Sequence, residues 1–430
     1  MKFNTITRNA MAAAMSLAIG LGTVACSRDY TAAYVYAVSN APTGNGGAAI
    51  SAFAVDYQTG ILTQISGSPF NTQFTNPSLV LAAPNNKTIY VVSGTNEDGV
   101  QAFKVGSDGK VYGQTPVNLY GTATYPTAAA IDTTGTFLYV TYTYQSGYTT
   151  VSPGPGGVSI YPISQTDGTL GTPTNVNVGN DPIAIAVSAP TCTTTPVLSS
   201  NTACASGGTP NVFVYVVDAE TALAKPTILG FAQNTSTGAL TMLSGTSFNT
   251  TLGTYQGTTA GVSPSAVAID PTSKYLYVTD KLQNEIYGYQ IASLNTGNLI
   301  PLVSSPFATG SYPVAITIEP RGKYVYVANY NSGTVNSYSL NLANGSLGGS
   351  ASTGSGFTTA TGPTCVTVEP ALGIYLYTSN YLDGSISGGK LNPNTGQLTS
   401  VENTPFPTGS FPSCATTVPN GPHATQLIEP

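Results

Sequence analysis

The stretch YVYVAN, residues 324–329, decides the fold, because variants of it recur along the chain. Close copies are AYVYAV at 33–38, FLYVT at 137–141 and YLYVTD at 275–280. One tyrosine marks each copy: Tyr36, Tyr90, Tyr139, Tyr215, Tyr277, Tyr326 and Tyr377. A unit of roughly 50 residues that recurs in this way indicates a repeat architecture, in which most recurring residues serve the repeat itself.

Each unit begins with a proline and contains four β-prone segments. The prolines are Pro77, Pro126, Pro182, Pro264, Pro313, Pro363 and Pro412. Small and bulky residues then alternate, as in AVAID at 266–270, so the two kinds face opposite sides of a strand. The tyrosine segment follows, then a third segment, and then a turn that ends in glycine, which permits a positive φ. These glycines are Gly60, Gly109, Gly168, Gly238, Gly297, Gly345 and Gly396.

Four antiparallel strands repeated seven times predict an all-β, seven-bladed β-propeller of four-stranded blades. The chain enters the repeat at a tyrosine segment and ends on a proline-led segment, FPSCATTV at 411–418. We therefore expect the C-terminal strand to complete the N-terminal blade, which would remove two exposed strand edges. The propeller is predicted as a single domain at 32–418, followed by a C-terminal tail at 419–430.

The first 25 residues have the pattern of a signal peptide. A positive start precedes an apolar run at 10–22 that is too short to span a bilayer. The run ends in TVAC at 23–26, which fits ordinary signal cleavage and also resembles a lipoprotein box, with the lipid on Cys26. Residues 26–31 are then a short linker. The protein is predicted to be exported to the periplasm, outer membrane or surface of a bacterium, with membrane contact only through a lipid anchor.

Four cysteines remain after Cys26, and an even number suits an oxidising compartment. Cys192 and Cys204 flank a Thr/Ser-rich insertion, so we expect a Cys192–Cys204 disulfide that restrains the loop. Cys365 and Cys414 occupy equivalent places in neighbouring innermost strands. Their side chains are expected to point the same way around the ring, which works against a bond. A Cys365–Cys414 disulfide and two buried thiols both remain open.

Composition excludes several classes of function. Only 7% of the residues are charged, and the net charge of −6 with a pI near 4.6 argues against nucleic-acid binding, which needs a basic surface. No His/Cys spacing fits a zinc site, and the single histidine, His423, lies beyond the last strand. We expect no cofactor, no metal and a monomer.

The third residue after each recurring tyrosine is polar in every copy, which predicts a polar ring around one end of the axis. Its members are Ser39, Ser93, Tyr142, Asp218, Asp280, Asn329 and Asn380. These side chains could shape the turns through hydrogen bonds to their own backbone. Alternatively they could bind a central ligand, with Asp218, Asp280 and the neighbouring Lys281 as candidate catalytic residues. Asp218 and Asp280 belong to successive blades, so each carboxylate could perturb the pKa of the other.

The text YVYVANYNSGTV at 324–335, IYLYTSNYLDGSI at 374–386 and YLYVTD resembles the YVTN-type repeats of the lactonase family of seven-bladed propellers. The resemblance covers about residues 32–418. It implies hydrolysis of a sugar-acid lactone such as 6-phosphogluconolactone, which needs a base, a group that stabilises the oxyanion, and cations for the phosphate. No His–Arg–Glu set of the family can be carried over onto this sequence.

Two functions therefore remain open. The favoured interpretation is an exported module of the cell envelope that binds a small molecule, a carbohydrate or an envelope protein, or acts as a scaffold. The alternative is a lactonase, similar to 6-phosphogluconolactonase, in which rim carboxylates activate water.

Overall fold

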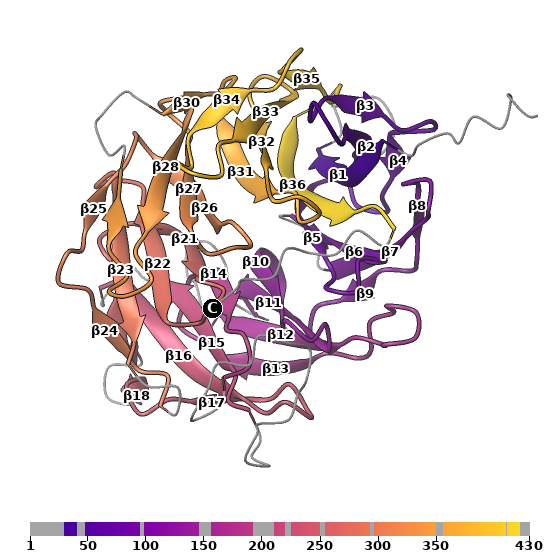
Figure 1. Ribbon diagram of the computed structural model, residues 1–430. Helices are drawn as coiled ribbons and strands as arrows, with labels where there is room; N and C mark the ends of the chain where they lie inside the picture. The colour runs from indigo at the N-terminus through magenta and orange to yellow at the C-terminus, as the bar shows by residue number, and fades with distance from the viewer. Residues whose placement is uncertain are drawn as a thin grey trace, which may run out of the picture.

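The computed structural model describes residues 30–40, 48–94, 99–145, 156–191, 210–219, 225–249, 254–292, 296–349, 356–409 and 411–421. Seven antiparallel sheets are arranged as blades around one axis (Figure 1). This confirms the predicted seven-bladed β-propeller. The described residues form strands, turns and loops, and none of them belongs to a helix that could cross a membrane.

We name the blade that contains β1 blade A, and blades B to G follow in chain order. From A to G, the innermost strands are β36 (Pro412–Pro419), β5 (Pro77–Ala82), β10 (Thr124–Ile131), β14 (Pro182–Val187), β21 (Pro264–Ile269), β26 (Pro313–Ile318) and β31 (Pro363–Val368). The second strands are β1 (Thr31–Ser39), β6 (Thr88–Ser93), β11 (Phe137–Tyr144), β15 (Phe213–Asp218), β22 (Tyr275–Asp280), β27 (Tyr324–Asn329) and β32 (Tyr375–Asn380). The third strands are β2 (Ala49–Asp56), β7 (Gly99–Val105), β12 (Gly157–Pro162), β16 (Thr227–Gln233), β23 (Glu285–Ile291), β28 (Thr334–Leu340) and β33 (Ser385–Leu391).

The outer edge of the blades differs from the prediction of one fourth strand. In six blades the third strand pairs with two short pieces, one near each of its ends. The pieces after the glycine turns are β3 (Leu62–Gln64), β8 (Val111–Gly113), β17 (Leu240–Met242), β24 (Leu299–Pro301), β29 (Leu347–Gly348) and β34 (Leu398–Ser400). A piece at the other end is present in all seven blades: β4 (Phe70–Asn71), β9 (Val117–Asn118), β13 (Thr174–Asn177), β20 (Thr258–Thr259), β25 (Phe307–Ala308), β30 (Phe357–Thr358) and β35 (Phe406–Pro407).

Blade C lacks a strand after its glycine turn, where Ile163 and Leu170 form only an isolated bridge. In blade D, an extra hairpin lies between β17 and β20 in the sequence. It consists of β18 (Ser247–Asn249) and β19 (Thr254–Gln256).

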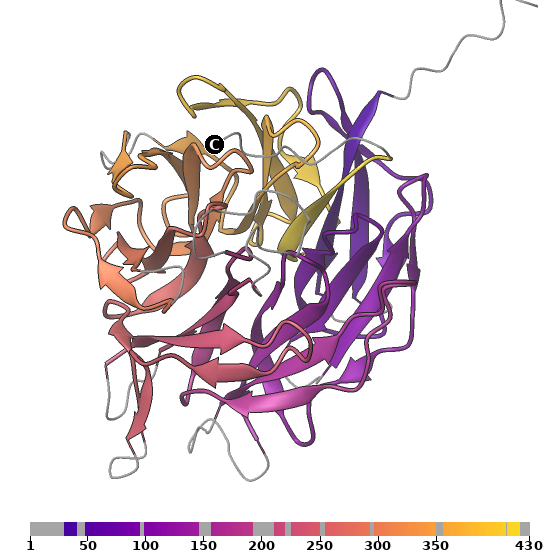
Figure 2. The same cartoon turned by 60° about the horizontal axis from the view of Figure 1, so that its bottom comes forward.

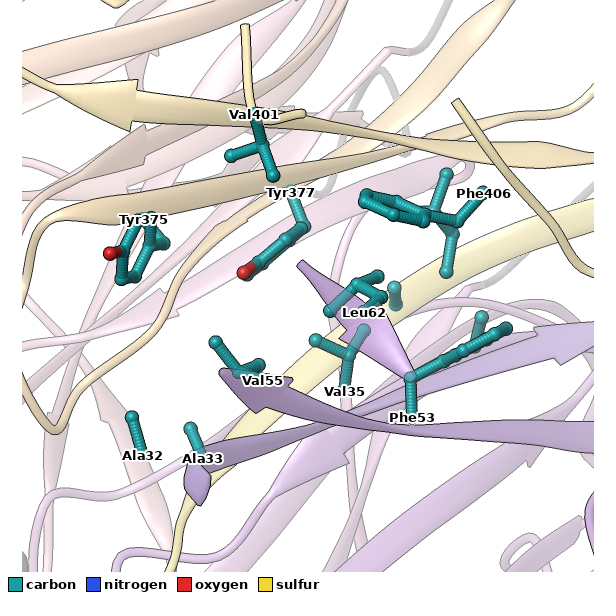
Figure 3. Packing of buried hydrophobic residues seen from close by; sticks show 13 residues of the cluster. Ala32, Ala33, Val35, Phe53, Val55, Leu62, Tyr375, Tyr377, Val401 and Phe406 are labelled. Carbon is teal, nitrogen blue, oxygen red and sulfur yellow. The ribbon is translucent and has the colours of Figure 1, made fainter. Parts of the chain in front are cut away.

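The ring closes in the predicted way. The C-terminal strand β36 pairs antiparallel with β1, and Tyr36 lies opposite Thr416. Blades G and A then pack through a continuous apolar interface, in which Tyr377 and Phe406 of blade G lie against Leu62 of blade A (Figure 3). The first and last blades thus share main-chain hydrogen bonds and a core, and neither presents a free inner edge.

A disulfide reinforces the same closure. Cys365 of β31 and Cys414 of β36 are bonded, with their Cα atoms 5.0 Å apart. The expectation that their shared direction works against a bond is wrong, because neighbouring innermost strands converge at the axis to a separation that suits a disulfide. The predicted Cys192–Cys204 bond lies outside the described residues.

Each recurring tyrosine links its own blade to the next one. Its hydroxyl donates to the main-chain carbonyl of the glycine in the next blade's turn. The bonds join Tyr36 to Gly109, Tyr90 to Gly168, Tyr139 to Gly238, Tyr215 to Gly297, Tyr277 to Gly345, Tyr326 to Gly396 and Tyr377 to Gly60, at 2.6 to 3.1 Å. Burial raises the pKa of all seven tyrosines, so the hydroxyls stay protonated and can donate. The seven glycines all have positive φ, as predicted.

We expect Tyr326→Phe to lower the free energy of unfolding by about 1 kcal/mol, because the buried Gly396 carbonyl loses its 3.0 Å hydrogen bond while the aromatic ring stays in place. Urea unfolding should show a lower midpoint with an unchanged slope. Tyr112→Phe is the matched control, since Tyr112 is 58% exposed, and it should leave the midpoint unchanged. An equal effect of both substitutions would contradict a role for the link between blades.

Candidate functional site: the mouth of the axial channel

The upper rim is the end of the propeller where the second strands finish and the innermost strands begin. In every blade the residue three places after the recurring tyrosine lies opposite the blade-opening proline. Examples are Asp218 opposite Pro182 and Asp280 opposite Pro264. The seven residues of the predicted polar ring therefore occupy equivalent places at this rim.

The side chains of the polar ring are buried, with at most 1% of each residue exposed. Asp280 accepts four main-chain hydrogen bonds through its two carboxylate oxygens. The donors are the amides of Val262 (2.6 Å), Ser263 (2.9 Å), Leu282 (3.0 Å) and Gln283 (3.0 Å). These bonds hold the two rim loops of blade E together, and they occupy the carboxylate that was a candidate for catalysis.

Other members of the polar ring have similar surroundings. Asp218 accepts the main-chain amide of Asp181 at 2.8 Å. The Asn329 amide donates to Asn336 at 2.8 Å, and Ser93 accepts the main-chain amide of Gly99 at 2.9 Å. The two carboxylates of the polar ring thus accept main-chain amides of the rim loops beside them.

A second ring of residues lies at the same rim, next to the polar ring, and is less buried. It consists of the residues that directly precede the seven prolines, and we call it the mouth ring. Its members are Asn76, Tyr125, Asp181, Ser263, Tyr312, Gly362 and Phe411. All of them except Gly362 are partly or fully exposed. The mouth ring was not predicted, although the sequence carries one signal of it. The residue type before the proline differs from copy to copy, as expected at a position that the repeat does not fix.

Asp181 is the carboxylate of the mouth ring. Burial raises the pKa of its side chain, and this effect is opposed by a hydrogen bond from the Thr143 hydroxyl (3.4 Å to Oδ1) and by the positive charge of Lys281. Burial, helped by the charge of Asp181, also raises the pKa of Tyr144. Side chains of the two neighbouring blades, C and E, therefore act on this carboxyl group of blade D.

Lys281 is the predicted site residue that the structure places near Asp181. It follows β22 directly, and its main-chain amide donates to Ser263 of the mouth ring at 2.9 Å. Its side chain is partly exposed, so the ammonium group is available at the rim. Among the described residues of the upper rim, Lys225 is the other cation.

Two pairs of tyrosines lie on either side of these charged residues in the blade order. In blade C, the rings of Tyr125 and Tyr144 meet edge to face, with centroids 4.7 Å apart. In blade F, the rings of Tyr312 and Tyr330 lie 6.2 Å apart at 56°. The order around the axis is thus a tyrosine pair, Asp181, Lys281 and a second tyrosine pair.

A pocket of ≈ 430 Å³ lies below the mouth, among the innermost strands. Leu79, Ala129, Ile316 and the disulfide between Cys365 and Cys414 contribute to its wall. Its volume lies in the usual range for small-molecule sites. Within the described ranges, no three His, Cys, Asp or Glu side chains are grouped so that they could hold a metal ion.

The mouth thus combines a carboxylate of raised pKa with a nearby ammonium group. A carboxylate of this kind can accept a proton from water, and an ammonium group can stabilise a developing oxyanion. Arg321 cannot add to this set, because it lies on the opposite rim, where its Nε atom donates to Glu319 at 2.9 Å.

Solved structures with the same fold cover nearly the whole chain. A candidate 6-phosphogluconolactonase from Bacteroides fragilis has 18% identity and a TM-score of 0.64, covering 91% of this chain and 99% of its own. The periplasmic gluconolactonase PpgL from Pseudomonas aeruginosa has 14% identity and a TM-score of 0.64, covering 90% of this chain and 99% of its own. Likeness at this level of identity shows the fold alone. A search of curated protein sequences finds no match.

The family comparison is more specific. The model described as "Lactonase, 7-bladed beta-propeller" matches residues 34–228 and 213–368, which is well over half of the chain. The repeat, the ring closure and this match agree, and the chain therefore belongs to the lactonase family of seven-bladed β-propellers.

Proposed function

We propose that this protein is a lactone hydrolase, and that Asp181 at the mouth of the axial channel activates the attacking water. The observation that carries the proposal is the Asp181 carboxyl group, which is half-buried and has a raised pKa. The positive charge of Lys281 acts on it and favours its ionised form. Membership of the lactonase family supports the reaction class. The gluconolactonase and the candidate 6-phosphogluconolactonase of the same fold support a sugar-acid lactone as substrate.

The reaction requires one proton acceptor and one group that stabilises negative charge. The Asp181 carboxylate takes a proton from water while the water oxygen forms a bond to the lactone carbonyl carbon. Lys281 stabilises the negative charge that develops on the carbonyl oxygen. The tetrahedral intermediate then collapses, the bond between the carbonyl carbon and the ring oxygen breaks, and protonated Asp181 returns its proton to that oxygen. The product is a hydroxy acid, which ionises in solution.

The direct test is hydrolysis of glucono-δ-lactone by the purified protein, followed by the release of acid across a range of pH. Because the ionised form of Asp181 is the active one, the rate should rise with pH through a pKa above the ordinary value of about 4. A rate equal to that of the buffer alone at every pH would contradict the proposal.

Lys281→Met should move the acidic limb of the pH–rate profile, in which the rate rises with pH, to higher pH. The ammonium group favours the ionised form of Asp181 and lowers its pKa, so its removal raises that pKa further. The rate at acidic pH should fall more than the rate on the plateau. Lys225→Met is the matched control, because Lys225 is an exposed lysine of the same rim, and it should leave the limb in place. An unchanged limb in Lys281→Met would show that the charge does not act on the base.

A binding module of the cell envelope is the second candidate. It is favoured because Asp280, a predicted catalytic residue, accepts four main-chain amides and serves to hold the rim loops. In this proposal the protein is exported, carries a lipid on Cys26, and binds a small molecule, a carbohydrate or an envelope protein at the mouth. Residues 1–29 lie outside the described part of the chain. Mass spectrometry of the mature N-terminus would distinguish lipidated Cys26 from a plain cleaved end, and the hydrolysis assay would separate binding from catalysis.

A further inference from the structure

We propose that the two tyrosine pairs of the upper rim are the walls that hold the ring of a neutral, unphosphorylated ligand at the mouth. The pairs are Tyr125 with Tyr144 in blade C and Tyr312 with Tyr330 in blade F. The inference deepens the proposed function and rests on it only for the identification of that ring as a lactone.

The backbone at Tyr125 and Tyr312 points to a function for these side chains. Both residues have positive φ, 61° and 60°, a conformation that is unfavourable for a bulky side chain. Both also precede a proline, which normally holds the residue before it in an extended conformation. Gly362 occupies the equivalent place in blade G with a φ of 70°, so the fold accepts glycine here. Tyrosine at these two places therefore costs stability that glycine would not cost.

The two pairs lie on either side of Asp181 and Lys281 in the blade order. Tyr144 is close enough to Asp181 that the carboxylate charge contributes to its raised pKa, so the blade C pair lies near the proposed base. The blade F pair follows Lys281 in the blade order, and the Tyr312 amide is held by the Asn284 side chain at 2.8 Å. All four tyrosines are partly exposed, so a ligand ring can reach them for stacking.

The charges of the rim favour a neutral ligand over a phosphorylated one. Asp181, Glu285 and Asp383 are partly or fully exposed here, whereas Lys225 and Lys281 are the cations among the described rim residues. A phosphate group brings about two further negative charges and is usually bound by arginine or by several donors. The arginine of the described part of the chain, Arg321, donates to Glu319 on the opposite rim.

The test uses Tyr125→Gly and Tyr312→Gly, because glycine removes the aromatic ring and adopts the positive φ without strain. Calorimetric titration with glucono-δ-lactam, which is neutral and resists hydrolysis, should show binding weakened about tenfold by each substitution. The thermal midpoint should stay the same or rise. Tyr112→Gly, at an exposed tyrosine of blade B far from the mouth, should leave binding unchanged. The wild-type protein should bind the lactam at least about tenfold more tightly than its 6-phosphate.

The outcomes separate this inference from the proposed function. If the lactam binds in a tyrosine-dependent way and no lactone is hydrolysed, the ring-binding site stands and the hydrolase proposal fails. If Asp181-dependent hydrolysis occurs while both glycine variants bind the lactam like the wild type, the hydrolase stands and the ring-binding site is overturned. Absence of lactam binding, lower thermal midpoints with unchanged binding, or tighter binding of the phosphorylated lactam would also overturn it.

Discussion

Asp181→Asn should lower kcat/KM for hydrolysis of glucono-δ-lactone by about 10²–10⁴-fold, the usual contribution of a general base. Asparagine has nearly the same shape as aspartate and can still accept the Thr143 hydroxyl at the Oδ1 position. It cannot accept a proton from water. The main-chain amide of residue 181, which donates to Asp218, is unaffected by the change. The measurement is acid release over a range of substrate concentrations, so that kcat and KM are separated.

The control for this prediction is Asp383→Asn. Asp383 is an exposed carboxylate of the same rim that accepts the Ser385 hydroxyl at 2.9 Å, so its substitution changes the net charge equally. It should leave kcat/KM close to the wild-type value. A similar loss in both variants would assign the effect to the charge of the rim, and full activity of Asp181→Asn would remove Asp181 from the mechanism.

Gly396→Ala should destabilise the fold by about 2–5 kcal/mol, the sum of a left-handed backbone for an L-residue and a steric overlap. Gly396 has a φ of 71°, and a Cβ atom there would lie 2.2 Å from the ring of Tyr324. Its carbonyl also accepts the Tyr326 hydroxyl, so any shift of the turn weakens the link between blades F and G. Urea unfolding, read as a free energy, measures the loss.

Gly409→Ala separates the two contributions. Gly409 has a φ of 79°, but a Cβ atom there would meet nothing within 4 Å. Only the backbone cost of about 1–2 kcal/mol should therefore appear. If both alanine variants lost the same stability, the contact with Tyr324 would contribute nothing, and the glycine turn would be fixed by its backbone alone.

The repeat made most of the fold predictable. A fixed spacing between proline, tyrosine and glycine determines which residues share a level in each blade, and the structure places all seven copies accordingly. Closure of the ring followed from the order of the segments at the two ends. The outer edge was less predictable, because its short pieces carry little hydrophobic pattern, and blade C shows only the bridge between Ile163 and Leu170 there.

The candidate site was less predictable for a physical reason. Spacing gives the level of a residue along the axis, but it does not show whether the adjoining loops cover its side chain. Asp280 lies at the level of the mouth, yet the amides of its own rim loops surround it. Asp181 directly precedes the proline and remains partly exposed. Burial raises its pKa, and the two side chains that oppose this effect, Thr143 and Lys281, belong to other blades and are distant in sequence.

The links between tyrosine and glycine have a consequence for how the chain could be rearranged. Because the seventh link, from Tyr377, returns to Gly60 of blade A, every boundary between blades carries the same bond. The start of β1 and the end of β36 are neighbours as well, since the Asn420 side chain donates to the Thr31 carbonyl at 3.0 Å (Figure 2). A short linker could join these two ends, and new termini could be opened in the connection between any two blades. Such circular permutants should fold to the same ring, because the order of the blades around the axis does not depend on which blade is made first.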